Sequence, residues 1–181
     1  LELAKLIILN YSPDINHGQQ KMIALLFDMN VLWEEYVLRA LKKHALKHSE
    51  EMLTVTGQES KTFYGTQRTI RPDIVLKKGG ETIIIDTKWK RPTNKAASIE
   101  DLRQMYAYAR FWDTNKVVLL YPGDSYDSGY KSYPNPNDLN DHETEFHQCK
   151  IAMVNVLKDG VLSENLAEEV LGLVVLENSY L

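Results

Sequence analysis

Two apolar runs flank Gly79-Gly80 and form the clearest pattern along the chain. A two-residue Gly-Gly turn between two such runs predicts a β-hairpin over residues 71–88. Folding the chain about this turn creates four cross-strand pairs: Lys78 with Glu81, Leu76 with Ile83, Ile74 with Ile85, and Asp73 with Asp86. Because successive side chains of a strand point to opposite faces, we expect Asp73, Asp86 and Lys88 to share one face and the paired aliphatic residues the other.

Apolar residues at helical spacing predict two long helices, over residues 29–46 and 99–112. Asp28 suits the N-cap position of the first helix. Ser98, followed by Asp101, resembles a capping box at the start of the second helix. A third helix is expected to begin after Ser163.

Shorter apolar runs predict strands at residues 54–56, 116–121 and 146–157, and residues 63–69 lead into the hairpin. Residues 123–140, rich in Gly, Ser, Pro and Asn, predict a long loop, and Asp159-Gly160 predicts a turn. This order of elements predicts an α/β fold in which helices flank a mixed sheet. We expect a single domain over residues 1–181, with residues 1–20 the remnant of an upstream helix and loop of a longer protein.

The composition narrows the class of protein. The chain has 181 residues, of which 44% are hydrophobic and 25% charged, as in an ordinary globular domain. No apolar run approaches the ~18 residues that suggest a membrane span, and no signal-peptide layout is visible. The single cysteine, Cys149, excludes an internal disulfide and suits a reducing compartment. We therefore expect a soluble, cytoplasmic protein with no membrane partner.

Charge is distributed unevenly, although the net charge is −4. Residues 61–95 carry nine lysines and arginines against three acidic residues, whereas residues 100–181 carry six against fourteen. The basic segment contains the paired aspartates of the hairpin. A positive rim around an acidic pocket suits a polyanionic substrate, but a solvated hairpin with ordinary lysines explains the charge equally well.

The two aspartates of the hairpin point to a metal site. Residues paired across antiparallel strands lie only ~4.5–5.5 Å apart, so Asp73 and Asp86 would repel each other unless a positive charge lay between them. A divalent cation with Lys88 beside it meets this need. Such an arrangement is the outline of a metal-dependent phosphodiester hydrolase.

Helical spacing separates two adjacent glutamates of the first helix. Glu34 is surrounded by Val31, Val37, Leu38 and other mainly apolar positions, and it therefore leans toward the buried side, whereas Glu35 leans toward solvent. A buried carboxylate is costly unless it is paired or binds a metal. Glu34 is thus a candidate third acidic ligand, with an ion pair to a lysine or a capping role as the alternative.

On the second helix, Gln104 and Tyr108 lie at i and i+4, on one face. Their side chains offer hydrogen-bond donors and acceptors that could hold a phosphate or brace a metal site, although an ordinary amphipathic helix explains the pair as well. His44 and His48 share the same spacing late in the first helix, and there a surface role is favoured over metal binding. No Gly-rich phosphate loop is present, so the chain itself is not expected to hydrolyse GTP.

These motifs together resemble a known family. Asp73, preceded by Pro72, and the string Asp86-Thr87-Lys88 resemble the PD-(D/E)xK nuclease motif, and Glu34 and Gln104-x-x-x-Tyr108 resemble its RecB-like branch. Four longer strings, at residues 26–37, 71–76, 86–90 and 101–108, are similar to the nuclease domain of the McrC family, the cleavage subunits of McrBC-type restriction systems. The resemblance spans about residues 20–122 and continues more loosely to the end. It implies a restriction-endonuclease-like core.

The resemblance also implies roles for these residues. Asp73 and Asp86 would bind Mg²⁺, for which Mn²⁺ can substitute, with the backbone carbonyl of Thr87 as a further ligand and Glu34 bound directly or through water. Lys88 would position the attacking water and stabilise charge on the phosphate. Gln104 and Tyr108 would support the site or contact the DNA backbone.

The implied partners are double-stranded DNA and an McrB-like AAA+ GTPase, in a prokaryotic cytoplasm. The GTPase would be bound through a region that we expect to lie outside this chain. Two alternatives remain open. One is an inactive nuclease fold that binds DNA or a partner, against which the retention of Asp73, Asp86 and Lys88 argues. The other is a phosphotransfer or small-molecule enzyme, against which the missing nucleotide loop argues.

Overall fold

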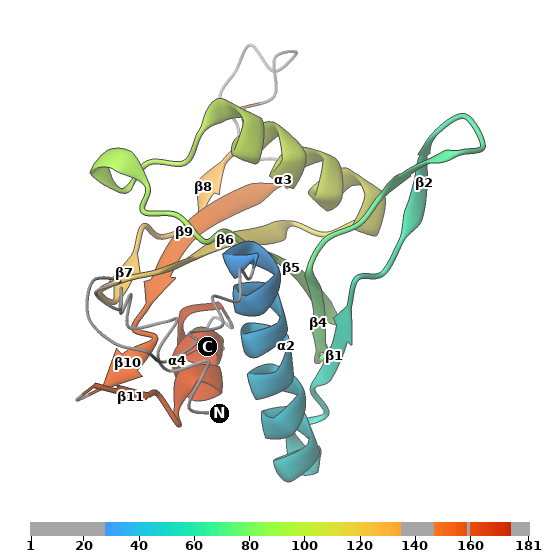
Figure 1. The fold of residues 1–181 in the computed structure, drawn as a ribbon. Helices are drawn as coiled ribbons and strands as arrows, with labels where there is room; N and C mark the ends of the chain where they lie inside the picture. The colour runs from blue at the N-terminus through green and yellow to red at the C-terminus, as the bar shows by residue number, and fades with distance from the viewer. Residues whose placement is uncertain (1–27, 135–146, 159, 175–181) are drawn as a thin grey trace, which may run out of the picture.

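The computed structural model describes residues 28–134, 147–158 and 160–174. Its centre is a seven-stranded mixed sheet in the order β1-β4-β5-β6-β9-β7, with β8 also paired to β9 (Figure 1). Strands β1 (Thr54–Gly57), β4 (Ile74–Lys78) and β5 (Glu81–Thr87) are antiparallel neighbours, whereas β5, β6 (Lys116–Pro122) and β9 (Gln148–Val154) run parallel. The predicted α/β class and mixed sheet are confirmed.

The hairpin has the predicted turn and register. Gly79 and Gly80 both have positive φ angles, 59° and 84°, which a two-residue type I′ turn requires and which glycine adopts without strain. Residues 74–78 pair with residues 81–85, including the three innermost predicted pairs. The fourth pair is absent from this ladder, because Asp73 precedes β4 in a bend and the Thr87 backbone N–H donates to its carboxylate instead.

Helices cover both faces of the sheet (Figure 1). Helix α2 (Met29–Lys47) and helix α4 (Leu166–Val174) pack on one face, against a core that includes Ile74, Leu76, Ile83 and Ile85. Helix α3 (Ile99–Trp112) covers the other face, against a second core that includes Val75 and Ile84. The alternation predicted for the hairpin therefore separates the two cores.

Both predicted N-caps are present. The Asp28 carboxylate accepts a hydrogen bond from the backbone N–H of Asn30, at 2.9 Å. The Ser98 hydroxyl accepts one from the backbone N–H of Asp101, at 3.1 Å. Each satisfies a donor that the first turn of a helix leaves unpaired. The cap at Ser98 fixes the start of α3, which carries Gln104 and Tyr108.

Other predictions need correction or lie outside the described residues. Residues 146–157 do not form one strand: β9 ends at Val154, and β10 (Leu157–Lys158) pairs separately with β11 (Val161–Leu162). Within the predicted loop 123–140 lie the short strands β7 (Tyr126–Asp127) and β8 (Lys131–Ser132), both paired to β9. Residues 1–20, residues 135–140 and Asp159 are outside the described part of the chain.

Three further elements were not expected as such. Strands β2 (Lys61–Tyr64) and β3 (Arg68–Ile70) form a separate hairpin just before the site, which projects away from the main sheet in Figure 1. Short 3₁₀ helices occupy η1 (Ser49–Glu51) and η2 (Thr93–Lys95). Among the described residues, no helix combines the length and the apolar character needed to cross a lipid bilayer.

Candidate active site

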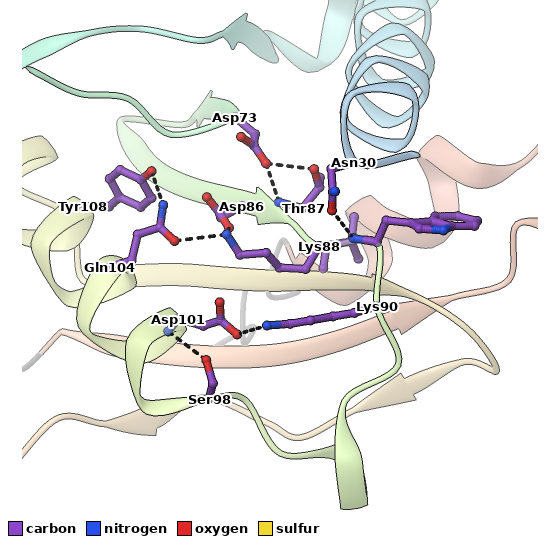
Figure 2. Close-up of polar contacts among 12 residues, drawn as sticks. Asn30, Asp73, Asp86, Thr87, Lys88, Lys90, Ser98, Asp101, Gln104 and Tyr108 are labelled. Carbon is purple, nitrogen blue, oxygen red and sulfur yellow. Dashed lines mark hydrogen bonds and ion pairs between the residues drawn. The ribbon is translucent and has the colours of Figure 1, made fainter. Parts of the chain in front are cut away.

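The predicted acidic residues meet at the end of the central strand β5. Asp86 is the penultimate residue of β5 and lies on the face of the sheet that α3 covers. It is buried, and the residue is only 1% exposed. Asp73 immediately precedes β4, the strand that neighbours β5. Figure 2 shows the two carboxylates next to each other, with Lys88 and Thr87 beside them. The hairpin register therefore brings together the residues that the sequence pattern selected.

Asp73 is held in place by the residue that follows Asp86. Its Oδ2 atom accepts hydrogen bonds from the Thr87 backbone N–H at 2.7 Å and from the Thr87 hydroxyl at 2.8 Å (Figure 2). Two donors on one oxygen fix the orientation of the carboxylate. The position of the other oxygen of this carboxylate, Oδ1, is therefore fixed as well.

Asp86 is a buried charge with incomplete compensation. Its Oδ2 atom lies 2.6 Å from Lys88 Nζ, yet it has no hydrogen bond of acceptable geometry among the described residues. Burial, and next the negative charge of Asp73, raise the pKa of Asp86 to about 6, and the Lys88 ammonium opposes this rise. An additional cation at this position would relieve both unfavourable effects.

Lys88 is positioned by α3. Its ammonium group donates to Gln104 Oε1 at 3.0 Å while it contacts Asp86, and its backbone N–H donates to the Leu120 carbonyl of β6 at 3.0 Å. Gln104 Nε2 donates in turn to the Tyr108 hydroxyl at 2.7 Å, and that hydroxyl donates to the Arg71 carbonyl at 2.8 Å. A continuous chain of hydrogen bonds thus links Lys88 to the segment that carries Asp73, and Figure 2 shows its part from Lys88 through Gln104 to Tyr108.

The chain of contacts bears on the two roles considered for Gln104 and Tyr108. Tyr108 is 2% exposed, and both its donor and an acceptor site of its hydroxyl are occupied within the protein. Burial also raises the pKa of the Tyr108 hydroxyl, so it stays neutral. This geometry supports a bracing role for Tyr108, and Gln104, which is partly buried, is the residue through which the brace reaches Lys88.

The helix phase predicted for the two glutamates is observed. Glu35 is exposed and forms an ion pair with Arg39 at 2.5 Å, whereas Glu34 is half-buried. Glu34 reaches the site through an intermediary, because its Oε1 atom accepts a hydrogen bond from Gln58 Nε2 at 2.6 Å. Burial is the main cause that raises the pKa of Glu34, and the negative charge of Asp73 adds to it.

Gln58 is the residue that sequence reasoning missed. Its backbone N–H donates to the Asp73 carbonyl at 2.9 Å, so it connects Glu34 with the loop that carries Asp73. Its φ angle is +54°, which is uncommon for a residue other than glycine. Gly57-Gln58 after an apolar strand was the only sequence signal for this bend, and it does not indicate which partner the side chain takes.

A second unpredicted contact lies on the opposite side of the site. Lys90 Nζ is 2.5 Å from Asp101 Oδ2, and Asp101 is buried at the start of α3. Hydrogen bonds from Lys90 and Ser98 hold the pKa of Asp101 below its usual range despite partial burial. The pair fastens the segment after β5 to the first turn of α3 (Figure 2).

The fold and the site define a class: a mixed α/β domain whose central strand ends in two neighbouring aspartates and a lysine, braced by the next helix. Comparison with known proteins agrees with the sequence resemblance. A family model described as "McrBC 5-methylcytosine restriction system component" matches residues 1–122, and the chain belongs to that family. The McrC-type assignment made from the motifs is confirmed.

One solved structure gives an independent comparison of the fold. The chain is similar to a chain in the refined half-complex from the tetradecameric assembly of Thermococcus gammatolerans McrB AAA+ hexamers with bound McrC, with a TM-score of 0.51 and 19% sequence identity. The match covers 79% of this chain and 33% of that chain, so the present chain spans about a third of its length. No curated protein matches the chain.

Proposed function

We propose that this chain is the nuclease domain of a restriction-system cleavage subunit, a Mg²⁺-dependent endonuclease with a PD-(D/E)xK core that hydrolyses phosphodiesters of double-stranded DNA. The observation that carries the proposal is the cluster of Asp73, Asp86 and Lys88 at the end of β5. Family membership supports a role in a restriction system. We further propose that the chain acts in the cytoplasm of a prokaryote.

The residues present fit a hard divalent cation. Carboxylate and carbonyl oxygens are the ligands that Mg²⁺ prefers, and few protein ligands suffice because the ion keeps several waters. Asp73 and Asp86 would hold it, with the carbonyl of Thr87 and, directly or through water, Glu34. Within the described part of the chain, the buried Asp86 Oδ2 atom accepts no hydrogen bond, and such an ion would coordinate it. When bound, Mg²⁺ would lower the pKa of the attacking water and neutralise charge on the phosphate.

The protein's own residues have separate tasks. Lys88, held between Asp86 and Gln104, keeps its ammonium beside the two carboxylates, where it orients the attacking water and stabilises negative charge that develops on the phosphate. Gln104 and Tyr108 restrict Lys88 to that position. Gln58 keeps Glu34 near Asp73.

The DNA would approach along the basic side of the site. The projecting β2–β3 hairpin carries the exposed residues Phe63, Tyr64 and Arg68, and Arg71 is exposed just beyond it. Cationic and aromatic side chains on a projecting hairpin are suited to contact phosphates and sugars. We assign recruitment to an McrB-like AAA+ GTPase bound through a region outside this chain, in line with the assembly of the structural relative.

A plasmid assay tests the proposal. The protein is incubated with supercoiled plasmid and Mg²⁺ or Mn²⁺, with and without the GTPase partner and GTP. Cleavage that requires the metal and disappears in Asp86→Asn supports the proposal. Full activity in Asp86→Asn refutes the site, and binding without cleavage under every condition favours the inactive DNA-binding or partner-binding module instead.

A further inference from the structure

A second cluster of metal-ligating side chains lies at the C-terminal end of α2 and on α4, helices that do not carry the aspartates. His44, His48 and Glu168 each offer one ligand atom, and these atoms all lie within 4.8 Å of one another. His44 lies in the last turn of α2, His48 is the C-cap residue that follows this helix, and Glu168 comes from α4, the helix that packs beside α2 (Figure 1). They line a cavity of about 740 Å³ between α2 and the β11–α4 segment.

We propose that His44, His48 and Glu168 bind a divalent transition-metal ion such as Zn²⁺ or Co²⁺, which fastens α4 to α2. Histidines at i and i+4 lie on one face of a helix, which is a common way to present two imidazoles to a metal. Their rings are stacked, with centroids 4.4 Å apart and planes 28° apart. Imidazole with one carboxylate suits Zn²⁺ and its neighbours in the first transition row, whereas Mg²⁺ prefers oxygen ligands alone.

The distances fit an ion with little movement. Ligand atoms around one Zn²⁺, with bonds of about 2.0–2.1 Å, lie roughly 3.3–4.2 Å apart. The three ligand atoms lie within 4.8 Å of one another, so a shift of about 1 Å would bring them to these distances. Glu168 is exposed and can supply this shift by rotating its side chain. Three protein ligands would leave a fourth position for water.

Carboxylates beyond the cluster lie near both imidazoles. His44 Nε2 lies 3.5 Å from Glu51 Oε1, and His48 Nδ1 lies 3.4 Å from Glu50 Oε1. Metal-binding histidines commonly direct their second ring nitrogen to a carboxylate, which fixes the tautomer and the ring. Here that arrangement would leave the other nitrogen of each ring for the ion. Among the described residues, His44 Nε2 is buried without a hydrogen bond. Fixing this ring beside Glu51 would therefore give Nε2 the hydrogen bond that it lacks.

Neighbouring cations do not prevent binding. Arg39, Lys43 and Lys47 also line the cavity, but Arg39 is paired with Glu35 and both lysines are exposed. Water and salt screen such exposed charges strongly. An anion in the same place would meet the Glu168 carboxylate, which favours a metal ion as the occupant.

Zinc titration in excess Mg²⁺ tests the site apart from the nuclease function. Calorimetry with ZnCl₂ and thermal denaturation are performed on the wild-type chain, His48→Ala, Glu168→Gln, the exposed neighbour Glu164→Gln as matched control, and Asp86→Asn. We expect one Zn²⁺ to bind and to raise the Tm of wild type, Glu164→Gln and Asp86→Asn alike. His48→Ala and Glu168→Gln should weaken Zn²⁺ affinity about 10-fold or more.

Three results would overturn the proposal. The first is no Zn²⁺ binding by the wild-type chain, and the second is unchanged affinity in both His48→Ala and Glu168→Gln. The third is loss of binding in Asp86→Asn, which would place the ion with the aspartates. Because binding and Tm are measured without DNA, failure here leaves the proposed nuclease function intact.

Discussion

Asp86 carries two opposing effects at one residue: the proposed chemistry needs its carboxylate at this position, and burial makes the charge of that carboxylate unfavourable. The carboxylate is buried beside Asp73, and among residues 28–134, 147–158 and 160–174 only the Lys88 ammonium compensates it directly. A protein keeps such a group at a cost in stability when function requires it. The effect of this charge on stability can therefore be measured by changing the pH and by substituting Asp86.

The metal-free protein should lose stability as the pH rises through the range in which Asp86 ionises. Its pKa is about 6 in the folded chain, against 3.8 for an unperturbed aspartate. The folded state therefore holds the proton more tightly, and the free energy of unfolding falls between about pH 4 and pH 6, by up to about 3 kcal/mol. Urea denaturation in the presence of a chelator, on wild type and Asp86→Asn, measures the difference.

The comparison between the two proteins isolates this residue from the other titrating groups. Relative to wild type, Asp86→Asn should become more stable as the pH rises from 4 to 6, and the difference should level off above pH 6. Parallel curves for the two proteins would contradict the assigned pKa.

The adjacent glutamates give a matched pair of variants. Glu34→Gln should lower DNA cleavage about 10-fold or more, as loss of an outer partner of a metal site does, because Glu34 reaches the site through Gln58. Glu35→Gln should change cleavage little, because Glu35 is exposed and pairs only with Arg39. Initial rates of plasmid nicking measure both, and equal effects would argue against a role for Glu34.

At the scale of elements, α3 holds the reactive end of β5 in place. The chain of hydrogen bonds from Lys88 through Gln104 and Tyr108 ends on the Arg71 carbonyl. It joins the strand with Asp86 to the segment with Asp73, so the helix sets the relative position of both. Lys90 and Asp101 add a second tie at the start of the same helix.

Tyr108→Phe tests this brace. Removing the hydroxyl leaves the Arg71 carbonyl and the Gln104 amide without their partner and should lower the free energy of unfolding by about 1–3 kcal/mol. Cleavage should also fall, because Lys88 loses part of its support. Arg103→Ala, an exposed position on the same helix, is the control for both measurements. Unchanged stability in Tyr108→Phe would show that these bonds contribute nothing.

Elements defined by local pattern were predictable from the sequence, and those defined by distant partners were not. Gly79-Gly80 and the alternation around it determine the hairpin register, and Asp28 and Ser98 signal the helix starts. Gln58 depends on a positive φ angle and on a partner in another element, and strands β7 and β8 are two residues long and form only against β9. Glu168 lies more than a hundred residues from His44, so no spacing rule connects them.

At the scale of the whole molecule, the cations of the basic segment are spread over several elements. Within the described residues, Arg71 is exposed two positions before Asp73 and Arg68 is exposed on the projecting β2–β3 hairpin, whereas Lys158 is exposed on β10, in the separate β10–β11 hairpin. With a net charge of −4, the chain should bind DNA weakly and lose that binding steeply with salt. Sequence and methylation preference should come from the partner.

Fluorescence anisotropy at several salt concentrations tests this arrangement. Arg68→Ala should weaken binding to any duplex and reduce the slope of log affinity against log salt by about one. Lys158→Ala should leave both unchanged. Methylated and unmethylated duplexes of one sequence should bind alike. Tight, salt-resistant binding that depends on methylation would show that recognition resides in this chain.

The most direct test of the central claim is metal-dependent cleavage of supercoiled plasmid in the presence of the proposed GTPase, comparing wild type with Asp86→Asn and Lys88→Ala in a subunit that includes the proposed GTPase-binding region. The two residues form the 2.6 Å contact on which the site assignment rests. We predict cleavage by wild type with Mg²⁺ or Mn²⁺, none after chelation, and none by either variant, with all three proteins folded and bound to the partner. Cleavage by Asp86→Asn at the wild-type rate would contradict the account.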